Sequence, residues 1–594
     1  MVWATPPLDF KNPACAESNQ IDFIASCRPL VVFAIFLGLL LFSNPCGLSG
    51  IGNGLDYFSC AFLCGETATV DLVHFSVHLS PDFAPCIFHA PRHVESPSQK
   101  LNLFILKAME QHLPHTTLSR IQNYIAGKLC NPISDRWIDN FQPATGQVYG
   151  KIAASDQYDV EAAIEAAQNA FQPWSKLPPA KRSEHLLALA NLMERDLEIL
   201  ASIESFDNGK PLHVARTVDI PRSISNIRFF ATAILHQSTD CHETETGVLN
   251  FTLRQPLGVV ACISPWNLPL YLFTWKIAPA LAAGNTVVAK PSEITPATAF
   301  YFSQLCSEAG IPPGVINILH GPGQAIGEPL LSAPRVKAIS FTGGTSTGAT
   351  IAAIAAPRFK KMSLELGGKN ATLVFADCDF ERTIAETVRA AFSNQGQICL
   401  CGSRIFIEQP LYERFKEAFV ERVKKLRVGD PSDVQSDIGA VVSKQHLEKV
   451  LSYVTLAKEE GGKLLCGGKQ ITFNGGYYME PTVFEGLDPY CRTNQEEIFG
   501  PVVTLYPFNS DDQAVEFANC TSFGLAFSVW TNNLNRAHRL SAELQAGIVW
   551  INCWMLRDLR TPFGGMKQSG VGREGGWEAL RFFTETKNIC INSL

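Results

Sequence analysis

The sequence lacks a concentration of positive charge. Its 49 Lys and Arg residues are outnumbered by 56 Asp and Glu, the formal net charge is -7, and no block of basic residues stands out. Proteins that bind nucleic acid usually carry a basic patch, so we expect no nucleic-acid partner. Charged residues make up only 18% of the chain and hydrophobic residues 46%. A chain of 594 residues with this composition buries large cores and folds as two or three domains.

Regularly spaced cysteines are absent as well. The 18 cysteines are spread along the chain without a repeating interval, which argues against the disulfide framework of a small secreted domain. We therefore expect a reducing compartment and place the enzyme-like part in the cytoplasm. A few close pairs have metal-ligand spacing, but no regular helical pattern aligns them and we predict no metal site. These pairs are Cys60/Cys64, His74/His78 and His89/His93.

The sequence also has little in the way of long hydrophobic runs, and its clearest one is short for a membrane span. Residues 1–115 form an atypical N-terminal extension whose clearest feature is the uncharged run 30–42, LVVFAIFLGLLLF. As a helix at about 1.5 Å per residue it spans roughly 20 Å, short of a bilayer core of about 30 Å unless its flanks join it. The preceding segment also lacks the positive region of a signal peptide. A membrane anchor, a peripheral or targeting extension, and a non-native extension from a misread gene start all remain open.

From about residue 120 the sequence alternates between β-rich runs and amphipathic or Ala-rich runs. The β-rich runs GVVACISP, GNTVVAKP, GVINILHG and VKAISFTG each precede a helical pattern. Helical spacing also begins at Asp159 and covers 180–206 and 215–234. This alternation predicts an α/β fold with a mostly parallel sheet covered by helices on both faces.

The stretch FSNQGQICLCGSR, 392–404, sets Cys399 and Cys401 among small and polar residues after a helical pattern. A thiol in such a place acts as a nucleophile if a base, an oxyanion donor and a cofactor site accompany it. A buried cysteine is more often an inert small hydrophobe. The rest of the sequence has to decide between these interpretations.

Two loops follow hydrophobic strands. Asn267, in SPWNLP, either donates its amide to an oxyanion or closes an Asx turn, and Lys276 lies in a helical stretch where lysines are usually solvated. In GNTVVAKPSE, Lys290 and Glu293 suit the two hydroxyls of a ribose, because groups beyond the carboxyl end of a parallel strand face the ligand crevice. A carboxylate there would repel a 2′-phosphate.

Three further stretches contain glycines or carboxylates that could belong to a site. In FTGGTSTG, Gly343 and Gly344 let backbone N–H groups approach a pyrophosphate at a helix N-terminus, or they form a tight turn. Glu365 lies in the apolar run MSLELGG, where burial raises a carboxyl pKa toward that of a general base; a charge at a strand end is the alternative. Glu497 and Phe499 lie in a turn-like stretch whose ordinary roles are surface and packing.

Seven motifs together resemble the NAD(P)-dependent aldehyde dehydrogenases. They are SPWNLP, KPSE, FTGGTSTG, LELGGK, FSNQGQICLCGSR, EEIFGP and PFGGMKQSGVGREGG, in that order, within roughly residues 120–594. The resemblance implies that Cys399 is the nucleophile with Cys401 as an auxiliary neighbour, and that Glu365 is the general base. It assigns the oxyanion hole to Asn267 and the backbone N–H of Cys399, and makes Lys276 a proton-relay partner.

The same resemblance implies NAD as the cofactor and assigns its contacts. Gly344 stands where many relatives have Ser, so one phosphate hydrogen bond is expected to be missing or supplied by backbone. Lys290 and Glu293 are assigned to the adenosine ribose and Glu497 to the nicotinamide ribose. The remaining implied cofactor contacts are Ile263, Trp266, Gly343, Gly344 and Phe499.

The implied architecture has a Rossmann-like cofactor domain, an α/β catalytic domain and a small β oligomerisation element. Members of the family assemble as dimers or tetramers, so we expect a homodimer or homotetramer, with a strand pair near 242–255 and 588–594 extending a neighbour's sheet. The expected domain boundaries are 116–241 with 256–366 for the cofactor domain, 367–567 for the catalytic domain, and 242–255 with 568–594 for the oligomerisation element and C-terminal tail.

A narrower resemblance concerns the substrate. DIPRSISNIRFFA, NQGQICLC and CWMLRDLRTPFGG are similar to the branch of the family that oxidises 2-aminomuconic 6-semialdehyde in kynurenine breakdown, where two arginines clamp the substrate carboxylate. The branch implies this role for Arg222 and Arg557, not for the nearby Arg560. Arg222 would also lie in the first turn of a helix, which disfavours a cation by about 0.3 to 1 kcal/mol. We therefore expect it to have a partner, such as Asp219, or a function.

Two other kinds of function remain open. Within the enzymes, 2-hydroxymuconic semialdehyde or a generic aliphatic aldehyde could be the small-molecule substrate. Outside them, the fold could serve as an inactive structural or binding protein, tethered to a membrane only through 30–42. The presence of every catalytic residue type that the family implies argues against an inactive protein.

Overall fold

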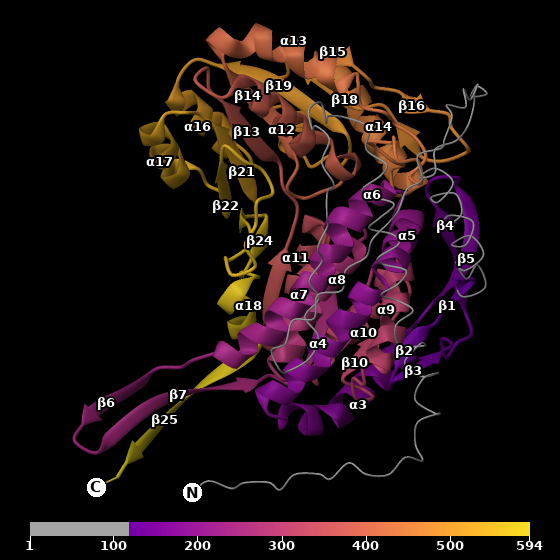
Figure 1. The fold of residues 1–594 in the computed structure, drawn as a ribbon, viewed down its shortest axis with the longest axis vertical. Coiled ribbons are helices and arrows are strands. Elements are labelled where there is room, and N and C mark those ends of the chain that lie inside the picture. The colour runs from indigo at the N-terminus through magenta and orange to yellow at the C-terminus, as the bar shows by residue number, and fades with distance from the viewer. Residues whose placement is uncertain (1–117, 594) are drawn as a thin grey trace, which may run out of the picture. The chain divides into compact units, whose positions relative to one another are not determined.

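The computed structural model describes residues 118–593 (Figure 1). The expectations for 1–115, including the apolar run 30–42 and the close Cys and His pairs, lie outside the described residues. Within 118–593, no helix combines the length and apolar character that crossing a bilayer requires. The predicted α/β class is confirmed, because two largely parallel sheets are each flanked by helices.

The first large sheet has eight strands, and its five central strands are parallel. Shorter antiparallel strands close both edges. In spatial order the strands are β24 (Gly570–Val571), β12 (Lys361–Glu365), β11 (Val336–Thr342), β8 (Val259–Ile263), β9 (Thr286–Lys290), β10 (Ile316–Ile318), β2 (Asn123–Ile125) and β3 (Lys128–Cys130).

Helices cover both faces of this sheet, and strand β8 shows why. Val260 and Cys262 pack into the core shared with α4, α7 and α8, whereas Val259, Ala261 and Ile263 pack into the core shared with α3, α10 and α11. A strand buried on both faces needs an apolar side chain at every position, which explains the continuous run GVVACI. The helices are α3 (Gln157–Ser175), α4 (Pro179–Arg195), α5 (Leu197–Asn208), α6 (Leu212–Val214), α7 (Ile220–Ala233), α8 (Pro269–Ala282), α9 (Ala297–Glu308), α10 (Gly323–Ser332) and α11 (Thr345–Ala355).

The second large sheet has seven strands, all parallel except the edge strand β15. The strands are β15 (Lys463–Cys466), β18 (Thr482–Glu485), β19 (Val502–Phe508), β14 (Gly402–Glu408), β13 (Asn370–Val374), β21 (Ala526–Trp530) and β22 (Ile548–Ile551). Its helices are α12 (Phe380–Phe392), α13 (Tyr412–Val423), α14 (Lys444–Glu459), α15 (Arg492–Gln495), α16 (Asp511–Asn519) and α17 (Leu534–Glu543). The chain passes from the first sheet to the second between Glu365 and Asn370, on either side of the expected boundary at 366/367.

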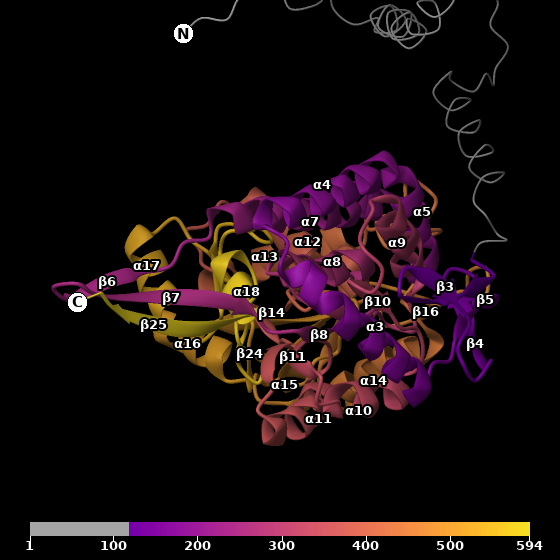
Figure 2. The same cartoon turned by 90° about the horizontal axis from the view of Figure 1, so that it is seen from below.

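Three antiparallel strands form an arm that projects from the body (Figures 1 and 2). They are β6 (Cys241–Glu245), β7 (Val248–Pro256) and β25 (Thr584–Asn592), and β25 pairs with β7 along its whole length. The start of the expected C-terminal segment 568–594 does not belong to the arm. Strand β24 instead pairs with β12 in the first sheet, and α18 (Gly576–Phe582) follows it. Smaller sheets are β1 (Arg120–Ile121) with β5 (Gln147–Ala153) and β4 (Trp137–Gln142), β16 (Gln470–Ile471) with β17 (Tyr478–Met479), and β20 (Phe523–Gly524) with β23 (Met566–Lys567).

Two helical expectations need correction. The single helix expected over 180–206 is two helices, because the chain turns at Asp196 between α4 and α5. Arg222 does not lie at a free helix start, because α6 and a π-helical turn, Ala215–Asp219, run directly into α7. The wider π turn accommodates Pro221, which lacks a backbone N–H. The expectation that a position in the first helical turn disfavours the charge of Arg222 therefore does not apply.

Candidate active site

The candidate site lies where the first sheet's strands end and face the loop before β14. A cavity of about 220 Å³ opens there. It brings together several predicted residues that are far apart in sequence, and it also contains His446 and Lys449, which the sequence did not single out. The lining residues are Pro265, Trp266, Asn267, Thr342, Gly343, Gly344, Leu366, Gly367, Cys399, His446, Lys449, Glu497 and Phe499.

The loop that carries Cys399 has an unusual backbone. After α12 ends, Asn394 and Gln395 have positive φ angles of 50° and 58°, and Gly396 follows with 69°. Such angles are disfavoured for residues with a side chain and persist where surrounding contacts hold them. The Gln395 side chain donates to the carbonyl of Ala440 (2.8 Å), and a Cβ on Gly396 would lie 2.4 Å from the Gly500 carbonyl oxygen. The loop is thus held in one conformation.

Cys399 and Cys401 occupy different environments. Cys399 lines the cavity and is half-buried, whereas Cys401 is buried and its thiol is oriented toward the Ser393 carbonyl at the end of α12 (3.9 Å). Burial raises the pKa of Cys399 above its usual range, and the carboxylates of Glu497 and Glu365 add to the effect. Burial raises the pKa of Cys401 to about 12. Both thiols therefore rest protonated, and only Cys399 opens to the cavity.

Asn267 connects the loop after β8 to the nucleophile loop. Its buried side-chain amide donates one hydrogen bond to the carbonyl of Gln397 (2.9 Å). A side-chain NH2 carries two N–H groups, so one remains for a ligand. The backbone N–H of Cys399 has no acceptor among residues 118–593. Both N–H groups expected to bind an oxyanion are therefore free to donate to a ligand. The side chain of Asn267 bonds to Gln397 and does not close an Asx turn.

Glu365 ends β12 and is buried. Its Oε1 atom has no hydrogen-bond partner in the described part of the chain. Burial raises its pKa well above the ordinary value, and the nearby carboxyl of Glu574 raises it further, against the opposing charges of Lys276 and Arg557. A carboxyl with a raised pKa is a stronger base than one on the surface, which suits proton abstraction near neutral pH.

Lys276 is not a solvated lysine. It is buried in α8, and its ammonium pairs with Glu574 (2.7 Å) and donates to the hydroxyl of Ser340 (3.2 Å). Glu574, which the sequence did not single out, also accepts a hydrogen bond from Ser340 (3.1 Å). Because 298 residues separate Lys276 from Glu574, no local pattern could reveal this pair. The only local sign of Glu574 in the sequence is the pair of charged residues inside the glycine-rich run GVGREGG.

The glycines after β11 form the N-terminal end of α11. A Cβ on Gly343 would lie 2.4 Å from the ring of Phe341, so only glycine fits there. Gly344 is the N-cap, its φ is -69°, no side chain caps the helix, and a Cβ would meet nothing within 4 Å. The unpaired N–H groups of a helix start next to open space fit an anionic phosphate group.

Aromatic rings and a carboxylate form the part of the cavity nearest Cys399. The ring of Trp266 packs edge-on against Phe499 (5.2 Å between centroids) and His446 (4.9 Å). Glu497 accepts a hydrogen bond from the Gly368 N–H (2.8 Å), and burial raises its pKa. A Cβ on Gly367 would lie 2.5 Å from Glu497, so glycine is required for this approach. The set fits a flat heterocycle attached to a sugar.

Lys290 and Glu293 lie together at the end of β9. Their side chains pair at 2.7 Å. Burial opposes ionisation of Glu293, but the charge and hydrogen bond of Lys290, together with backbone hydrogen bonds, outweigh it and lower the pKa of the carboxyl. Ile263 ends the neighbouring strand β8 with its side chain in the core shared with α3. These three residues do not line the 220 Å³ cavity. They lie at the same edge of the sheet as Gly343, because β8, β9 and β11 run parallel.

Arg222 and Arg557 converge on the same two aromatic residues. The guanidinium of Arg222 lies 5.7 Å from the ring centroids of both Tyr271 and Trp275, and that of Arg557 lies 5.4 Å from Trp275 and donates to the Tyr271 hydroxyl (2.9 Å). Neither arginine forms a salt bridge within 118–593, and Nε and Nη2 of Arg222 are buried without a partner. Burial lowers the pKa of Arg222, and the nearby charge of Arg557 contributes to the decrease.

The partner considered for Arg222 is taken, because Asp219 pairs with Lys210 (2.5 Å). Asp558 pairs with the exposed Arg560 (2.6 Å), although its charge also raises the pKa of Arg222. Two unpaired cations next to each other are unfavourable without an anion between them, so this place fits a carboxylate from outside the chain.

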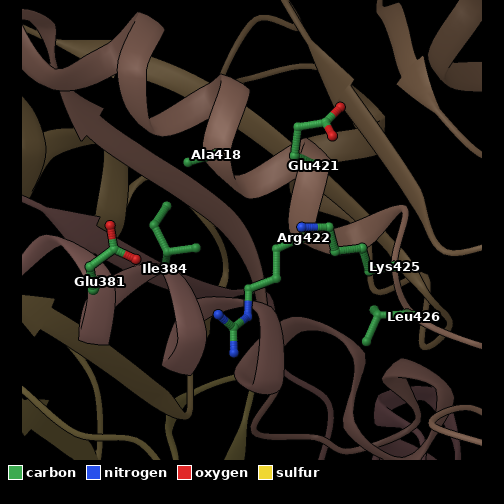
Figure 3. A pocket seen from close by; sticks show the side chains of 7 residues that line it. All are labelled: Glu381, Ile384, Ala418, Glu421, Arg422, Lys425 and Leu426. Carbon is green, nitrogen blue, oxygen red and sulfur yellow. The ribbon is translucent and has the colours of Figure 1, made fainter.

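Other features of the described residues carry no comparable chemistry. Within 118–593 no group of three or more His, Cys, Asp or Glu residues is arranged to hold a metal ion. A hollow of about 470 Å³ between α12 and α13 has a partly apolar floor with exposed charged side chains around it (Figure 3). It contains no nucleophile and lies apart from Cys399. Its lining residues are Glu381, Ile384, Ala418, Glu421, Arg422, Lys425 and Leu426.

Comparison with known proteins agrees with this chemistry. A sequence profile described as the aldehyde dehydrogenase family matches residues 131–589. The 2-aminomuconic semialdehyde dehydrogenase of Danio rerio is 50% identical over 478 residues, which cover 79% of this chain and 98% of the relative. The 2-hydroxymuconic semialdehyde dehydrogenase of Pseudomonas sp. (strain CF600) is 43% identical over 484 residues, 80% of this chain and 100% of the relative.

A solved structure has the same fold. The P. syringae indole-3-acetaldehyde dehydrogenase, in complex with NAD+ and IAA, superposes with a TM-score of 0.80 at 38% identity. The match covers 81% of this chain and 98% of that structure.

Proposed function

The chain belongs to the aldehyde dehydrogenase family, and from that membership we propose that it uses NAD to oxidise a semialdehyde that carries a carboxylate, of the 2-aminomuconic 6-semialdehyde type. The observation that carries the substrate class is the pair Arg222 and Arg557. Both guanidinium groups meet at Tyr271 and Trp275, and neither forms a salt bridge with a carboxylate of residues 118–593. An aldehyde with an anionic tail supplies the missing partner.

The reaction begins at Cys399. As its sulfur attacks the aldehyde carbon, the thiol proton passes to Glu365 and a C–S bond forms, while the electron pair of the C=O π bond moves to the oxygen, which becomes an oxyanion. The free N–H of the Asn267 amide and the backbone N–H of Cys399 donate to that oxygen. One such donor typically contributes about 3 to 4 kcal/mol of transition-state stabilisation. Cys401 is a buried neighbour and takes no part.

NAD, when bound, supplies the hydride acceptor that turns the thiohemiacetal on Cys399 into a thioester. The residues that would hold it are Gly343 and Gly344 for the pyrophosphate, and Lys290 and Glu293 for the adenosine ribose. Glu497, Trp266, His446 and Phe499 would enclose the nicotinamide end. Gly344 offers open space and an uncapped helix start, which is the feature of this chain that fits the phosphates.

Hydrolysis of the thioester requires a base. Glu365, whose pKa is raised by burial, accepts a proton from water as the oxygen of that water attacks the carbonyl carbon, and the C–S bond then breaks to free Cys399. Glu365 acts in both steps, so each proton that it accepts must leave the buried site before the next one is transferred. Glu574, Lys276 and Ser340 are hydrogen-bonded to one another beside Glu365 and form a route for it.

The substrate proposal is tested by comparing a carboxylated semialdehyde with an uncharged aldehyde of equal length. Charge-assisted hydrogen bonds contribute about 1.5 to 3 kcal/mol, so Arg222→Ala and Arg557→Ala should each lower kcat/KM for the carboxylated substrate roughly 10- to 150-fold. For the uncharged aldehyde we expect less than about a 3-fold change, because no anion meets the arginines. NADH formation at 340 nm reports the rate, and Cys399→Ala measures the background.

Arg560→Ala is the matched control. Arg560 is exposed and paired with Asp558, so its loss should change neither rate. Equal losses for both substrates in the Arg222 and Arg557 variants would contradict the carboxylate clamp and favour an aliphatic aldehyde. The 2-hydroxy and 2-amino semialdehydes, assayed side by side, identify which of the two is preferred. Absence of NADH formation across the whole panel would instead support an inactive binding protein.

A further inference from the structure

A buried ion cluster lies behind the loop that carries Asn267. It consists of Glu204 in α5, Lys210 after α5 and Asp219 at the end of the π-helical turn, and their side chains are 0%, 0% and 1% exposed. The Lys210 ammonium lies 2.5 Å from Asp219 and 3.5 Å from Glu204. Burial raises the pKa of both carboxyls, that of Glu204 to about 7. Burying three ionisable groups costs free energy of desolvation, so we expect the cluster to do more than fill space in the core.

Each member of the cluster touches a different part of the active site. Lys210 donates to the backbone carbonyl of Asn267 (3.1 Å). Glu204 accepts from the backbone N–H of Leu270 (3.4 Å) in the first turn of α8, the helix that carries Tyr271, Trp275 and Lys276. Asp219 directly precedes α7, the helix that carries Arg222.

The Lys210 ammonium is a charged donor to the Asn267 carbonyl, in contrast to the other side chains that donate to this loop. The side chain of Asn208 donates to the Trp266 carbonyl (2.8 Å), and that of Asn394 donates to the Asn267 carbonyl (3.0 Å), but both are neutral amides. Hydrogen bonds from an ionised donor are roughly twice as strong as neutral ones. The side-chain amide of Asn267 in turn holds the Gln397 carbonyl, two residues before Cys399.

We propose that Lys210 is a positioning residue for the oxyanion donor, which through its bond to the Asn267 carbonyl keeps the free N–H of the Asn267 amide directed at the substrate oxygen. Asp219 and Glu204 hold the ammonium in place from two sides. Oxyanion stabilisation depends steeply on geometry, so a small displacement of Asn267 is enough to slow the reaction. This inference rests on the oxyanion role proposed for Asn267.

A double-mutant cycle between Lys210 and Asn267 tests it. Under single-turnover conditions, with a carboxylated semialdehyde and saturating NAD, we expect Lys210→Met to slow thioester formation roughly 10- to 100-fold. In an Asn267→Ala background the same substitution should change the rate less than about 2-fold, because its target is already gone. The Kd for NAD, measured by fluorescence titration, should stay within about 2-fold of wild type.

Two further variants separate positioning from stability. Lys210→Met and Lys210→Gln both leave two buried acids without a cation, so the melting temperature of each is measured as well. Gln keeps a polar side chain one atom shorter, which no longer reaches the Asn267 carbonyl, and it should slow the reaction in the same way. Lys360 is the matched control: it is also buried and donates to a backbone carbonyl, that of Ala333 (2.6 Å), far from the cavity. Lys360→Met should lower the melting temperature without changing the single-turnover rate.

The outcomes are distinguishable. If Asn267→Ala keeps the wild-type rate, Asn267 does not stabilise the oxyanion, and the positioning role of Lys210 is wrong as well. If Asn267→Ala is slow but the Lys210 substitutions slow both backgrounds by the same factor, or neither, Asn267 keeps its role and only the inference about Lys210 is overturned.

Discussion

At the scale of single residues, Glu365 shows how surroundings determine chemistry. Burial is the largest cause of its raised pKa, the like charge of Glu574 is the second, and Lys276 acts in the opposite direction. A general base works only in its ionised form. The rate of thioester hydrolysis should therefore rise with pH as the pH passes through the raised pKa of Glu365.

We predict that Glu574→Gln shifts this pH dependence to lower values. The substitution removes the nearby negative charge and leaves Lys276 positive, and both changes lower the pKa of Glu365. The rising limb of the hydrolysis rate against pH, measured by stopped flow after the acyl-enzyme has formed, should move toward acid. The maximum rate should also fall, because the proton route is interrupted.

The opposite substitution provides the check. Lys276→Met removes the positive charge, so it should move the same limb toward alkaline pH. Shifts in the same direction for both variants, or no shift in either, would mean that the Lys276–Glu574 pair does not control the ionisation of Glu365.

At the scale of elements, the start of α11 is where we propose that the phosphates of NAD bind. Gly344 caps the helix without a side chain, and open space surrounds the position where a Cβ would stand. Its φ of -69° is accessible to any residue, so flexibility is not the reason for glycine here. With no side-chain cap at this helix start, the proposed phosphate contact falls to backbone N–H groups.

We predict that Gly344→Ser binds NAD more tightly. Serine is as good an N-cap as glycine or slightly better, and its hydroxyl adds a hydrogen bond to a phosphate oxygen. A net hydrogen bond contributes about 0.5 to 1.5 kcal/mol, so the Kd for NAD should fall roughly 2- to 10-fold in isothermal titration calorimetry. Gly343→Ser is the control and should have the opposite effect, because its Cβ would collide with Phe341.

At the scale of the whole molecule, the arm offers a surface for assembly. Register pairs Leu249 with Ile591 and Phe251 with Ile589, so these side chains lie on one face of the arm together with Leu253. Leu249 and Ile591 are 45% and 48% exposed. Both outer strands, β6 and β25, also have an edge without a neighbour in the described chain. Apolar faces and open edges of this kind favour pairing with another copy.

We predict that Leu249→Asp with Ile591→Asp converts a homo-oligomer into monomers. Burying charges in an apolar interface is unfavourable, whereas the same charges are harmless on a solvated arm. Light scattering after size-exclusion chromatography measures the mass. Thr252→Asp, on the other face of the same strand, should leave the mass unchanged; a monomeric wild type, or an oligomer that survives the double substitution, would contradict assembly through this face.

Much of the fold could be predicted because it depends on local pattern. The uninterrupted hydrophobic run of β8 reflects burial on both faces, and the order of strands and helices follows from periodicity. Local pattern also placed Asn267, Gly343, Gly344 and Glu365 where a strand ends, but it left their roles open, and those roles and the arm near 242–255 and 588–594 came from the family resemblance. The family resemblance added the assignment of Cys399 over Cys401, which the structure supports through exposure to the cavity.

The rest depends on contacts between elements that no local pattern encodes. The sequence alone determined the α/β class, the family and the residue types at the site, since these follow from side-chain periodicity and from the order of motifs. Only the tertiary structure decided that Asp219 pairs with Lys210, which leaves Arg222 without a salt bridge among residues 118–593. It also decided that Glu574 meets Lys276 across 298 residues, and that β24 joins the first sheet instead of the arm. A buried charge takes whichever partner packing brings within about 4 Å, and packing is a property of the whole chain.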